Sequence, residues 1–268
     1  MLKGRRMQVA CGDHVTVSKI DGGAVIERVA PRTTLVYRSD AYKEKLIAAN
    51  ATQIAGVVAP DIAVDESLLN RWIVAAEAEH CRFVVVANKS DLPGFDALRT
   101  RLQPYAKMGY PVVELQAKRN IAPLVPLLAR QRTVLIGQSG MGKSTLINAL
   151  LPLAAARVGD VSSALLSGRH TTSSSTLYPL PPDNDSWIVD SPGMKAFGLA
   201  HVAPDALAEA FVDLRPYLGH CRFRDCRHDS EPECAVRAAV DDGRIARQRL
   251  ALLHALVRES TAARDPAR

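Results

Sequence analysis

The sequence lacks long hydrophobic runs. None of its apolar stretches approaches about 18 residues, the length from which a transmembrane helix is expected. Residues 1–6 are basic, but no long apolar core follows them, which argues against a signal peptide. We therefore expect neither a transmembrane helix nor a signal peptide, and no membrane partner.

Cysteine is also scarce, and its distribution is uneven. Three of the five cysteines lie within residues 221–234, whereas Cys11 and Cys81 stand alone. In an intracellular chain, clustered cysteine and histidine favour a metal site over disulfides. The formal charge of +6 is a moderate basic excess. It is compatible with an RNA partner but does not demonstrate one.

The sequence does contain a phosphate-binding motif. Residues 137–145 match G-x-x-x-x-G-K-[S/T], between a predicted buried strand at 133–136 and a predicted helix from residue 146. Backbone N–H groups of such a loop, together with a helix N-terminus, bind phosphate. Lys143 would reach the β- and γ-phosphates, and Ser144 would hold Mg²⁺. The alternative is a chance glycine loop, which the flanking elements disfavour. The predicted residues are Gly137, Gln138, Ser139, Gly140, Met141, Gly142, Lys143, Ser144 and Thr145.

A second motif predicts which base the nucleotide carries. Residues 88–91 read Asn-Lys-Ser-Asp and follow a predicted buried strand at 82–87. Asp91 would accept hydrogen bonds from N1–H and the exocyclic amine of guanine, a pair of donors that adenine does not offer. Asn88 would brace the loop, and the stem of Lys89 would lie over the base. These residues could instead only cap the next helix, but their pairing with a phosphate loop favours guanine binding.

A weaker motif supports the same base. Gln116 and Ala117 follow a predicted strand at 111–115, where GTPases commonly have serine and alanine. The backbone N–H of Ala117 would meet guanine O6, and this role can survive the change from serine to glutamine. The motif gains weight only from its position.

Two segments after the phosphate loop would contact Mg²⁺ and the γ-phosphate. Asp190 and Gly193 belong to a D-x-x-G sequence after a predicted strand at 186–189, and would supply a Mg²⁺-shell carboxylate and a γ-phosphate donor. The polar segment 162–176 could place a threonine hydroxyl on Mg²⁺, and we favour Thr172 over Thr171. The alternative for this segment is a disordered Ser/Thr loop.

The order of these motifs is unusual. An ordinary GTPase has its phosphate loop first and its guanine motif near the end, whereas here the guanine motif precedes the phosphate loop. The sequence therefore predicts an α/β fold, a circularly permuted P-loop GTPase domain over residues 46–200. The chain after Gly193 would lead directly into a C-terminal domain, so that loss of the γ-phosphate could pull on it.

The N-terminal residues 1–45 predict part of a small barrel. Runs at 7–10, 14–20 and 24–29 read as strands, and the Asp-Gly-Gly sequence at 21–23 as a hairpin turn. We expect an incomplete barrel, or one that lacks a strand from its start, because the segment is short. Its basic residues could face RNA or simply solvent. They are Lys3, Arg5, Arg6, Lys19, Arg28, Arg32 and Arg38.

The C-terminal residues 201–268 predict a helical domain with a metal site. Three thiolates and an imidazole suit tetrahedral Zn²⁺ with no open position, hence one structural ion. Free cysteines in a loop are the alternative, and His220 is an alternative ligand. Helices are predicted at 204–214, 235–240 and 244–257, with frayed residues from Ser260. The zinc ligands are Cys221, Cys226, His228 and Cys234, and the arginines expected on the outer face of the last helix are Arg244, Arg247, Arg249 and Arg258.

This combination of motifs resembles the ribosome small subunit-dependent GTPase A family (RsgA/YjeQ). Besides the motifs above, residues 11–15 resemble the family's Gly-Asp-x-Val turn, and residues 168–172 its Gly-Arg-His-Thr-Thr segment. The resemblance implies an OB-type barrel and a bacterial, cytoplasmic GTPase that binds GTP and GDP. It also implies binding to the small (30S) ribosomal subunit and its 16S rRNA late in assembly, with release on hydrolysis. We expect a monomer.

The resemblance also bears on catalysis. Met194 stands where other GTPases carry a water-orienting glutamine, and it cannot orient water. The family assigns that role to a histidine that His170 matches, so the implied catalytic residues are His170, Lys143 and Thr172. No arginine finger is evident, so we expect slow intrinsic turnover and activation by a partner that orders residues 162–176.

The sequence departs from the family's pattern in two places, and two other functions are alternatives to this interpretation. Little sequence precedes the Gly-Asp turn, and Lys195 and Ala196 replace the Arg-Glu that the family often has. A GTP-dependent RNA-binding adaptor with incidental hydrolysis is the alternative function. An ATP-using enzyme is a further alternative, which Asp91 disfavours.

Overall fold

The computed structural model describes residues 8–39, 44–158, 175–180, 185–194 and 197–264. The chain divides into two compact units. Unit 1 comprises residues 1–37, 45–64 and 79–195, and unit 2 comprises residues 38–44, 65–78 and 196–268. The predicted domain boundaries near residues 45 and 200 remain predictions.

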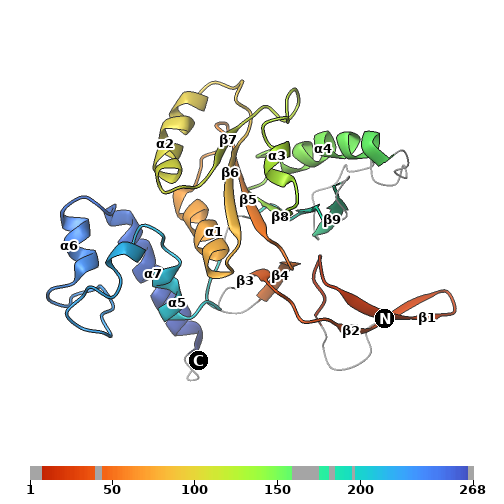
Figure 1. Ribbon diagram of the computed structural model, residues 1–268. Coiled ribbons are helices and arrows are strands. Elements are labelled where there is room, and N and C mark those ends of the chain that lie inside the picture. The colour runs from red at the N-terminus through yellow and green to blue at the C-terminus, as the bar shows by residue number, and fades with distance from the viewer. Residues whose placement is uncertain (1–7, 40–43, 159–174, 181–184, 195–196, 265–268) are drawn as a thin grey trace. The chain divides into compact units, whose positions relative to one another are not determined.

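Unit 1 is built on a six-stranded sheet with the order β7-β6-β5-β8-β10-β9 (Figure 1). Five strands are parallel, and β9 runs antiparallel to β10. This confirms the predicted α/β class, and every strand predicted for this domain is present. The strands are β5 (Gln53–Val58), β6 (Arg82–Ala87), β7 (Val112–Glu114), β8 (Arg132–Ile136), β9 (Thr176–Pro179) and β10 (Trp187–Asp190).

The central strands are easily read from sequence because they are apolar on both faces. Every residue of β5 is buried, and so is every residue of β6 after Arg82. Strands covered on both faces read as continuous runs instead of alternating patterns. The edge strand β9 was not predicted, since its four residues are partly exposed and it pairs only with β10.

Three helices of unit 1 follow its strands. They are α2 (Phe95–Lys107), α3 (Val125–Leu128) and α4 (Lys143–Val158). Helix α4 begins three residues earlier than predicted, because the carbonyl of Gly142 already accepts a helical hydrogen bond from the N–H of Leu146 at 2.9 Å. Lys143 and Ser144 therefore lie in its first turn.

The N-terminal segment forms two separate two-stranded sheets. Strands β1 (Val15–Ile20) and β2 (Gly23–Val29) make the predicted hairpin, with Gly22 at φ 79° in the turn. Strands β3 (Leu35–Ser39) and β4 (Glu44–Ala49) make the second sheet. Residues 8–10 form no strand, contrary to the predicted run at 7–10. In the described part of the chain these strands form two pairs and do not close a barrel, and the partial barrel over residues 1–45 remains a prediction.

The turn before β1 is fixed by an ion pair. Arg32 Nε and Nη2 donate to the two carboxylate oxygens of Asp13 at 2.7 and 2.8 Å. Burial raises the pKa of Asp13, but the bonds from Arg32 and the Ala10 N–H outweigh it and hold the pKa below its ordinary value. Arg32, predicted as one of the surface cations, therefore has a structural partner.

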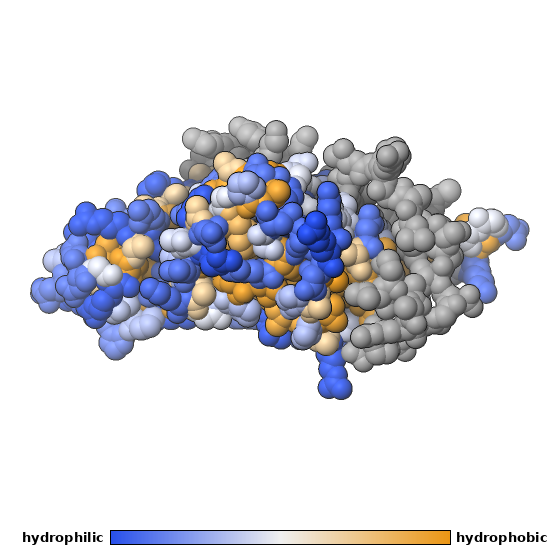
Figure 2. Space-filling model, turned by 90° about the horizontal axis from the view of Figure 1, so that it is seen from above, coloured by the Kyte–Doolittle hydropathy of each residue, from blue (hydrophilic) through white to orange (hydrophobic). Residues whose placement is uncertain are grey.

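Unit 2 is helical. Its helix α1 packs on α5, which packs on α7. Among the described residues, no helix is long and apolar enough to cross a membrane. On the face seen in Figure 2, hydrophilic residues predominate and hydrophobic residues gather in a few places between them. The elements are α1 (Glu66–Ala78), α5 (Pro204–Glu209), η2 (Arg215–Tyr217), α6 (Ala235–Asp241) and α7 (Arg247–Arg264).

Two helix ends in unit 2 differ from prediction. Helix α5 ends at Glu209 instead of near 214, and a short 3-10 turn follows. Helix α7 starts at Arg247 and continues to Arg264, although residues from Ser260 were expected to fray. Ser260 is fully buried and its hydroxyl donates to the carbonyl of Val202 at 2.6 Å, so tertiary contacts hold this end of the helix.

Arg249 was predicted to lie on the outer face of the last helix, and this prediction was wrong, because its side chain is buried. Its side chain is 5% exposed. The guanidinium donates to both carboxylate oxygens of Asp213 at 2.9 and 2.6 Å and to Asn70 Oδ1 at 2.8 Å. It also stacks 4.5 Å from the ring centre of Phe211. A buried guanidinium needs such partners to offset its lost hydration.

Replacing Arg249 by alanine should therefore destabilise unit 2. Removing one partner of a buried ion pair leaves the other charge unpaired, and we expect a loss of about 3–5 kcal/mol in the free energy of unfolding. Urea denaturation measures it. Arg258→Ala, an exposed arginine on the same helix, is the control and should change the stability by less than about 0.5 kcal/mol. Equal effects of the two substitutions would contradict this account.

Candidate nucleotide and metal sites

The predicted nucleotide-binding segments meet at one edge of the sheet. Residues 88–91 follow β6, residues 115–118 follow β7, residues 137–142 follow β8, and residues 191–194 follow β10. These four strands are parallel, so their carboxyl ends lie together. Ligands of open α/β sheets bind at this edge.

Asn88 joins three of the segments through one side chain. Its Nδ2 donates to the carbonyl of Met141 at 3.0 Å, and its Oδ1 accepts from the N–H of Ala117 at 3.0 Å. The residue is only 2% exposed. The Ala117 N–H was expected to donate to guanine O6. To do so, it would have to share its hydrogen between guanine O6 and Asn88 Oδ1, or give up its bond to Asn88.

A cavity of about 220 Å³ opens beside Asn88. Asp91, the predicted guanine-reading carboxylate, lines it together with Ala117 and Thr145. The cavity thus lies between the predicted base-binding segments and the start of α4. Its remaining lining residues are Asp61, Lys89, Leu92, Gln116, Lys118 and Gly142.

Lys89 is held by two contacts in a left-handed backbone conformation, φ 61°. Its ammonium donates to the Gly140 carbonyl at 2.8 Å and to Asp61 Oδ2 at 2.6 Å. Sequence reasoning did not identify Asp61. Its position just past the carboxyl end of β5, at the same edge of the sheet, was the available clue.

The phosphate loop closes around its own lysine. Lys143 is 8% exposed, and its ammonium donates to the carbonyls of Gly137 at 2.8 Å and Gln138 at 3.2 Å. Burial lowers its pKa, while the Asp190 carboxylate acts in the opposite direction. A phosphate at this loop would offer Lys143 a better partner than these carbonyls.

Gly142 is required by a close approach within the site. Its φ is 97°, and a Cβ placed on it would lie 2.3 Å from Nδ2 of Asn88. Neither the backbone conformation nor the space accepts a side chain.

The predicted Mg²⁺ ligands lie near each other where they are described. Ser144 Oγ donates to Oδ2 of Asp190 at 3.4 Å, and Asp190 is 5% exposed at the end of β10. His170, Thr171 and Thr172 lie outside the described residues.

The D-x-x-G segment packs directly on the phosphate loop. A Cβ on Gly193 would lie 3.0 Å from the backbone N of Ser139, and the N–H of Met194 donates to the Gly137 carbonyl at 3.2 Å. The Met194 side chain is 2% exposed. Met194 is therefore both buried and without a polar group.

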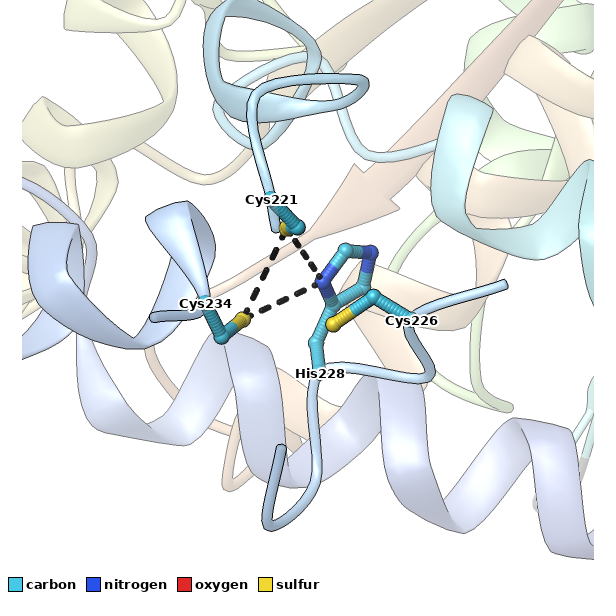
Figure 3. Close-up of side chains that lie close together, drawn as sticks. All are labelled: Cys221, Cys226, His228 and Cys234. Atoms are coloured by element: carbon cyan, nitrogen blue, oxygen red, sulfur yellow. Dashed lines mark hydrogen bonds between the residues drawn. The ribbon is translucent and has the colours of Figure 1, made fainter. Parts of the chain in front are cut away.

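Unit 2 contains a cluster of three cysteines and one histidine (Figure 3). The ligand atoms of Cys221, Cys226, His228 and Cys234 all lie within 4.8 Å of one another. His228 Nδ1 lies 3.5 Å from Cys221 Sγ and 3.4 Å from Cys234 Sγ. The cluster can hold a metal ion, and the alternative ligand His220 is not part of it.

A bound cation would change the protonation of the cluster. Burial and the neighbouring sulfurs raise the pKa of the Cys226 thiol to about 12, although a His228 backbone bond acts against this. A bound cation stabilises thiolates and reverses such a shift. Glu231 fixes the loop, because its carboxylate accepts N–H bonds from Arg227, Asp229 and Ser230, which lower its pKa to about 2.

Comparison with known proteins identifies related GTPases. A family model described as RsgA GTPase matches residues 29–200. The small ribosomal subunit biogenesis GTPase RsgA of Nitrosomonas europaea is 45% identical over 263 residues, 96% of this chain and 83% of the relative.

Solved structures show the same fold. The crystal structure of YjeQ from Thermotoga maritima aligns with a TM-score of 0.70 and 27% identity, over 97% of this chain and 88% of that one. YloQ, titled a circularly permuted GTPase, aligns with a TM-score of 0.67 and 23% identity, over 100% and 88%, and supports the fold alone.

Gly142→Ala should weaken guanine-nucleotide binding by about tenfold or more, because its methyl group would displace Asn88 and strain the backbone. Titration with fluorescent GDP measures the affinity. Gly23→Ala is the matched control, because a Cβ there meets nothing within 4 Å. Unchanged affinity of Gly142→Ala would show that the loop does not bind the nucleotide.

Proposed function

The chain belongs to the RsgA GTPase family, and from this premise we propose that it hydrolyses GTP in the maturation of the small (30S) ribosomal subunit. It would bind 16S rRNA in the cytoplasm as a monomer and leave the subunit on hydrolysis. The observation that carries the nucleotide assignment is the buried Asn88 side chain, which joins a guanine-type motif to a phosphate loop.

Base selection would depend on Asp91. Its carboxylate lines the cavity beside Asn88 and Ala117. A site built for two donors rejects a base that lacks them by about 10⁴-fold or more. The phosphates would lie on the backbone of residues 137–142, with Lys143 exchanging its present carbonyl partners for phosphate oxygens.

Mg²⁺ fits the residues at the phosphate end of the site. Ser144 and Asp190 offer a hydroxyl and a carboxylate near each other, which are ligands that this hard cation prefers. Mg²⁺ bound there would neutralise charge on the β- and γ-phosphates. Thr172 would be its further protein ligand, and Gly193 would donate its N–H to the γ-phosphate.

Catalysis would depend on a residue other than Met194, which is buried and apolar. We assign the orientation of the attacking water to His170, since a neutral imidazole can accept a proton from water. Intrinsic turnover would be slow until a partner orders residues 162–176. The ribosomal subunit would supply that order.

Release from the subunit would use the connection after Gly193. The chain runs from Met194 in unit 1 to Phe197 in unit 2, where Arg71 donates to the Phe197 carbonyl at 3.3 Å. Glu259 on α7 accepts from the Leu199 N–H at 2.7 Å and pairs with Arg71 at 2.7 Å. A movement of Gly193 on loss of the γ-phosphate would thus reach residues fixed to α1 and α7.

We also assign the metal in unit 2 as a single structural Zn²⁺. Three thiolates and one imidazole complete a tetrahedral set, so no position remains for a substrate or water.

GTP turnover with and without small subunits tests the proposed function. We expect slow turnover by the chain alone, at least about tenfold stimulation by subunits, and none with ATP. His170→Ala should abolish the stimulation and keep GTP affinity. Fast turnover that ignores subunits would contradict the proposal. If Thr172→Ala lost hydrolysis but kept subunit release, the chain would be an adaptor.

Metal analysis tests the zinc assignment. The purified chain should contain one zinc ion, and Cys226→Ser should lose it and destabilise unit 2 while GDP binding persists, since the nucleotide segments belong to unit 1. His220→Ala is the control and should keep the metal. A zinc content unaffected by Cys226→Ser would overturn the ligand set.

A further inference from the structure

Asp61 is a carboxylate at the edge of the nucleotide cavity that none of the family motifs discussed above includes. It lies in the loop between β5 and α1 and lines the same cavity as Asp91. Its Oδ2 lies 2.6 Å from the ammonium of Lys89, the residue whose stem is expected to cover the base.

The contact between Asp61 and Lys89 is part of a larger attachment of this loop to the phosphate loop. Lys89 also donates to the Gly140 carbonyl at 2.8 Å. A Cβ on Gly140 would lie 2.8 Å from Cδ1 of Ile62, so Ile62 packs closely on the same glycine. Further along, Arg101 donates to the Val64 carbonyl at 2.8 Å.

We infer that Asp61 is a positioning residue of the guanine-nucleotide site. It fixes the Lys89 ammonium above the phosphate loop and thereby slows release of the bound nucleotide. The inference rests on the proposed function, since it presumes that the cavity binds a guanine nucleotide. Asp61 itself does not contact the reacting atoms in this account.

The contacts with Asp61 and Gly140 reduce the conformational freedom of the Lys89 side chain. A lysine side chain has several rotatable bonds, and ordering it costs conformational entropy each time a ligand needs it in place. Asp61 and the Gly140 carbonyl order it before the nucleotide arrives. Their side chains are partly exposed, 26% for Lys89 and 41% for Asp61, so the effect will be moderate and sensitive to salt.

The experiment measures dissociation of fluorescent GDP from the whole chain after addition of excess unlabelled GDP. We expect Asp61→Ala to raise the dissociation rate about three- to tenfold. Raising the salt concentration should speed release from the wild type more than from Asp61→Ala. Asp61→Asn, which retains an oxygen acceptor for Lys89, should release GDP at an intermediate rate.

A double-mutant cycle separates positioning from a general structural effect. In the background of Lys89→Met, the Asp61→Ala substitution should add little further, because its partner is already absent. Asp96→Ala is the matched control. That aspartate is also ion-paired, with Arg99, but it is 92% exposed on α2, and its loss should leave GDP release unchanged.

Three results would overturn the inference. The first is an unchanged GDP dissociation rate in Asp61→Ala. The second is that the effects of Asp61→Ala and Lys89→Met on this rate multiply independently. The third is a change in rate that parallels a loss of thermal stability in Asp61→Ala, Asp61→Asn and Lys89→Met alike. Failure of the proposed function is distinguishable: a chain that binds no GDP would refute both, whereas normal GDP release without subunit stimulation would refute the ribosomal role alone.

Discussion

The carboxamide of Asn88 is the interaction on which the nucleotide site depends. It is buried and bonds to the Ala117 N–H on one side and the Met141 carbonyl on the other. Leaving either backbone group buried without a partner would cost about 1–3 kcal/mol. One side chain therefore fixes the base-binding segments relative to the phosphate loop, and Gly142 is needed because its backbone must pass so close to Asn88.

The permuted order of the motifs along the chain does not prevent them from meeting in space. The parallel strands still bring all four segments to one edge, whatever their order in the chain. The new feature is where the chain leaves unit 1 for unit 2. Of the places where the chain passes from unit 1 to unit 2, one runs from the Asp61 loop into α1, on the predicted base side, and another runs from Met194 to Phe197, on the predicted γ-phosphate side. Both ends of a bound nucleotide would thus contact a segment that leads into unit 2.

The sequence predicted what depends on local pattern. The boundaries of β6, the phosphate loop and the order of the motifs follow from continuous apolar runs and from fixed spacings, and so does the Cys-His cluster. It did not predict what depends on a distant partner. In the sequence Arg249 has the pattern of a surface cation, but in the structure it contacts Asp213 and Asn70. Ser260 lies where the helix was expected to fray, but it bonds to Val202. Asp61 belongs to no motif, and only its contact with Lys89 draws attention to it.

The Asn88 side chain holds the predicted base-binding and phosphate-binding segments together. Hydrogen exchange of the Asn88→Ala variant tests it most directly, with wild type as reference. We expect faster amide exchange in both residues 115–118 and residues 137–142, with the central strands β5 and β8 unchanged. Faster exchange confined to residues 88–91, or to only one of the two segments, would contradict it.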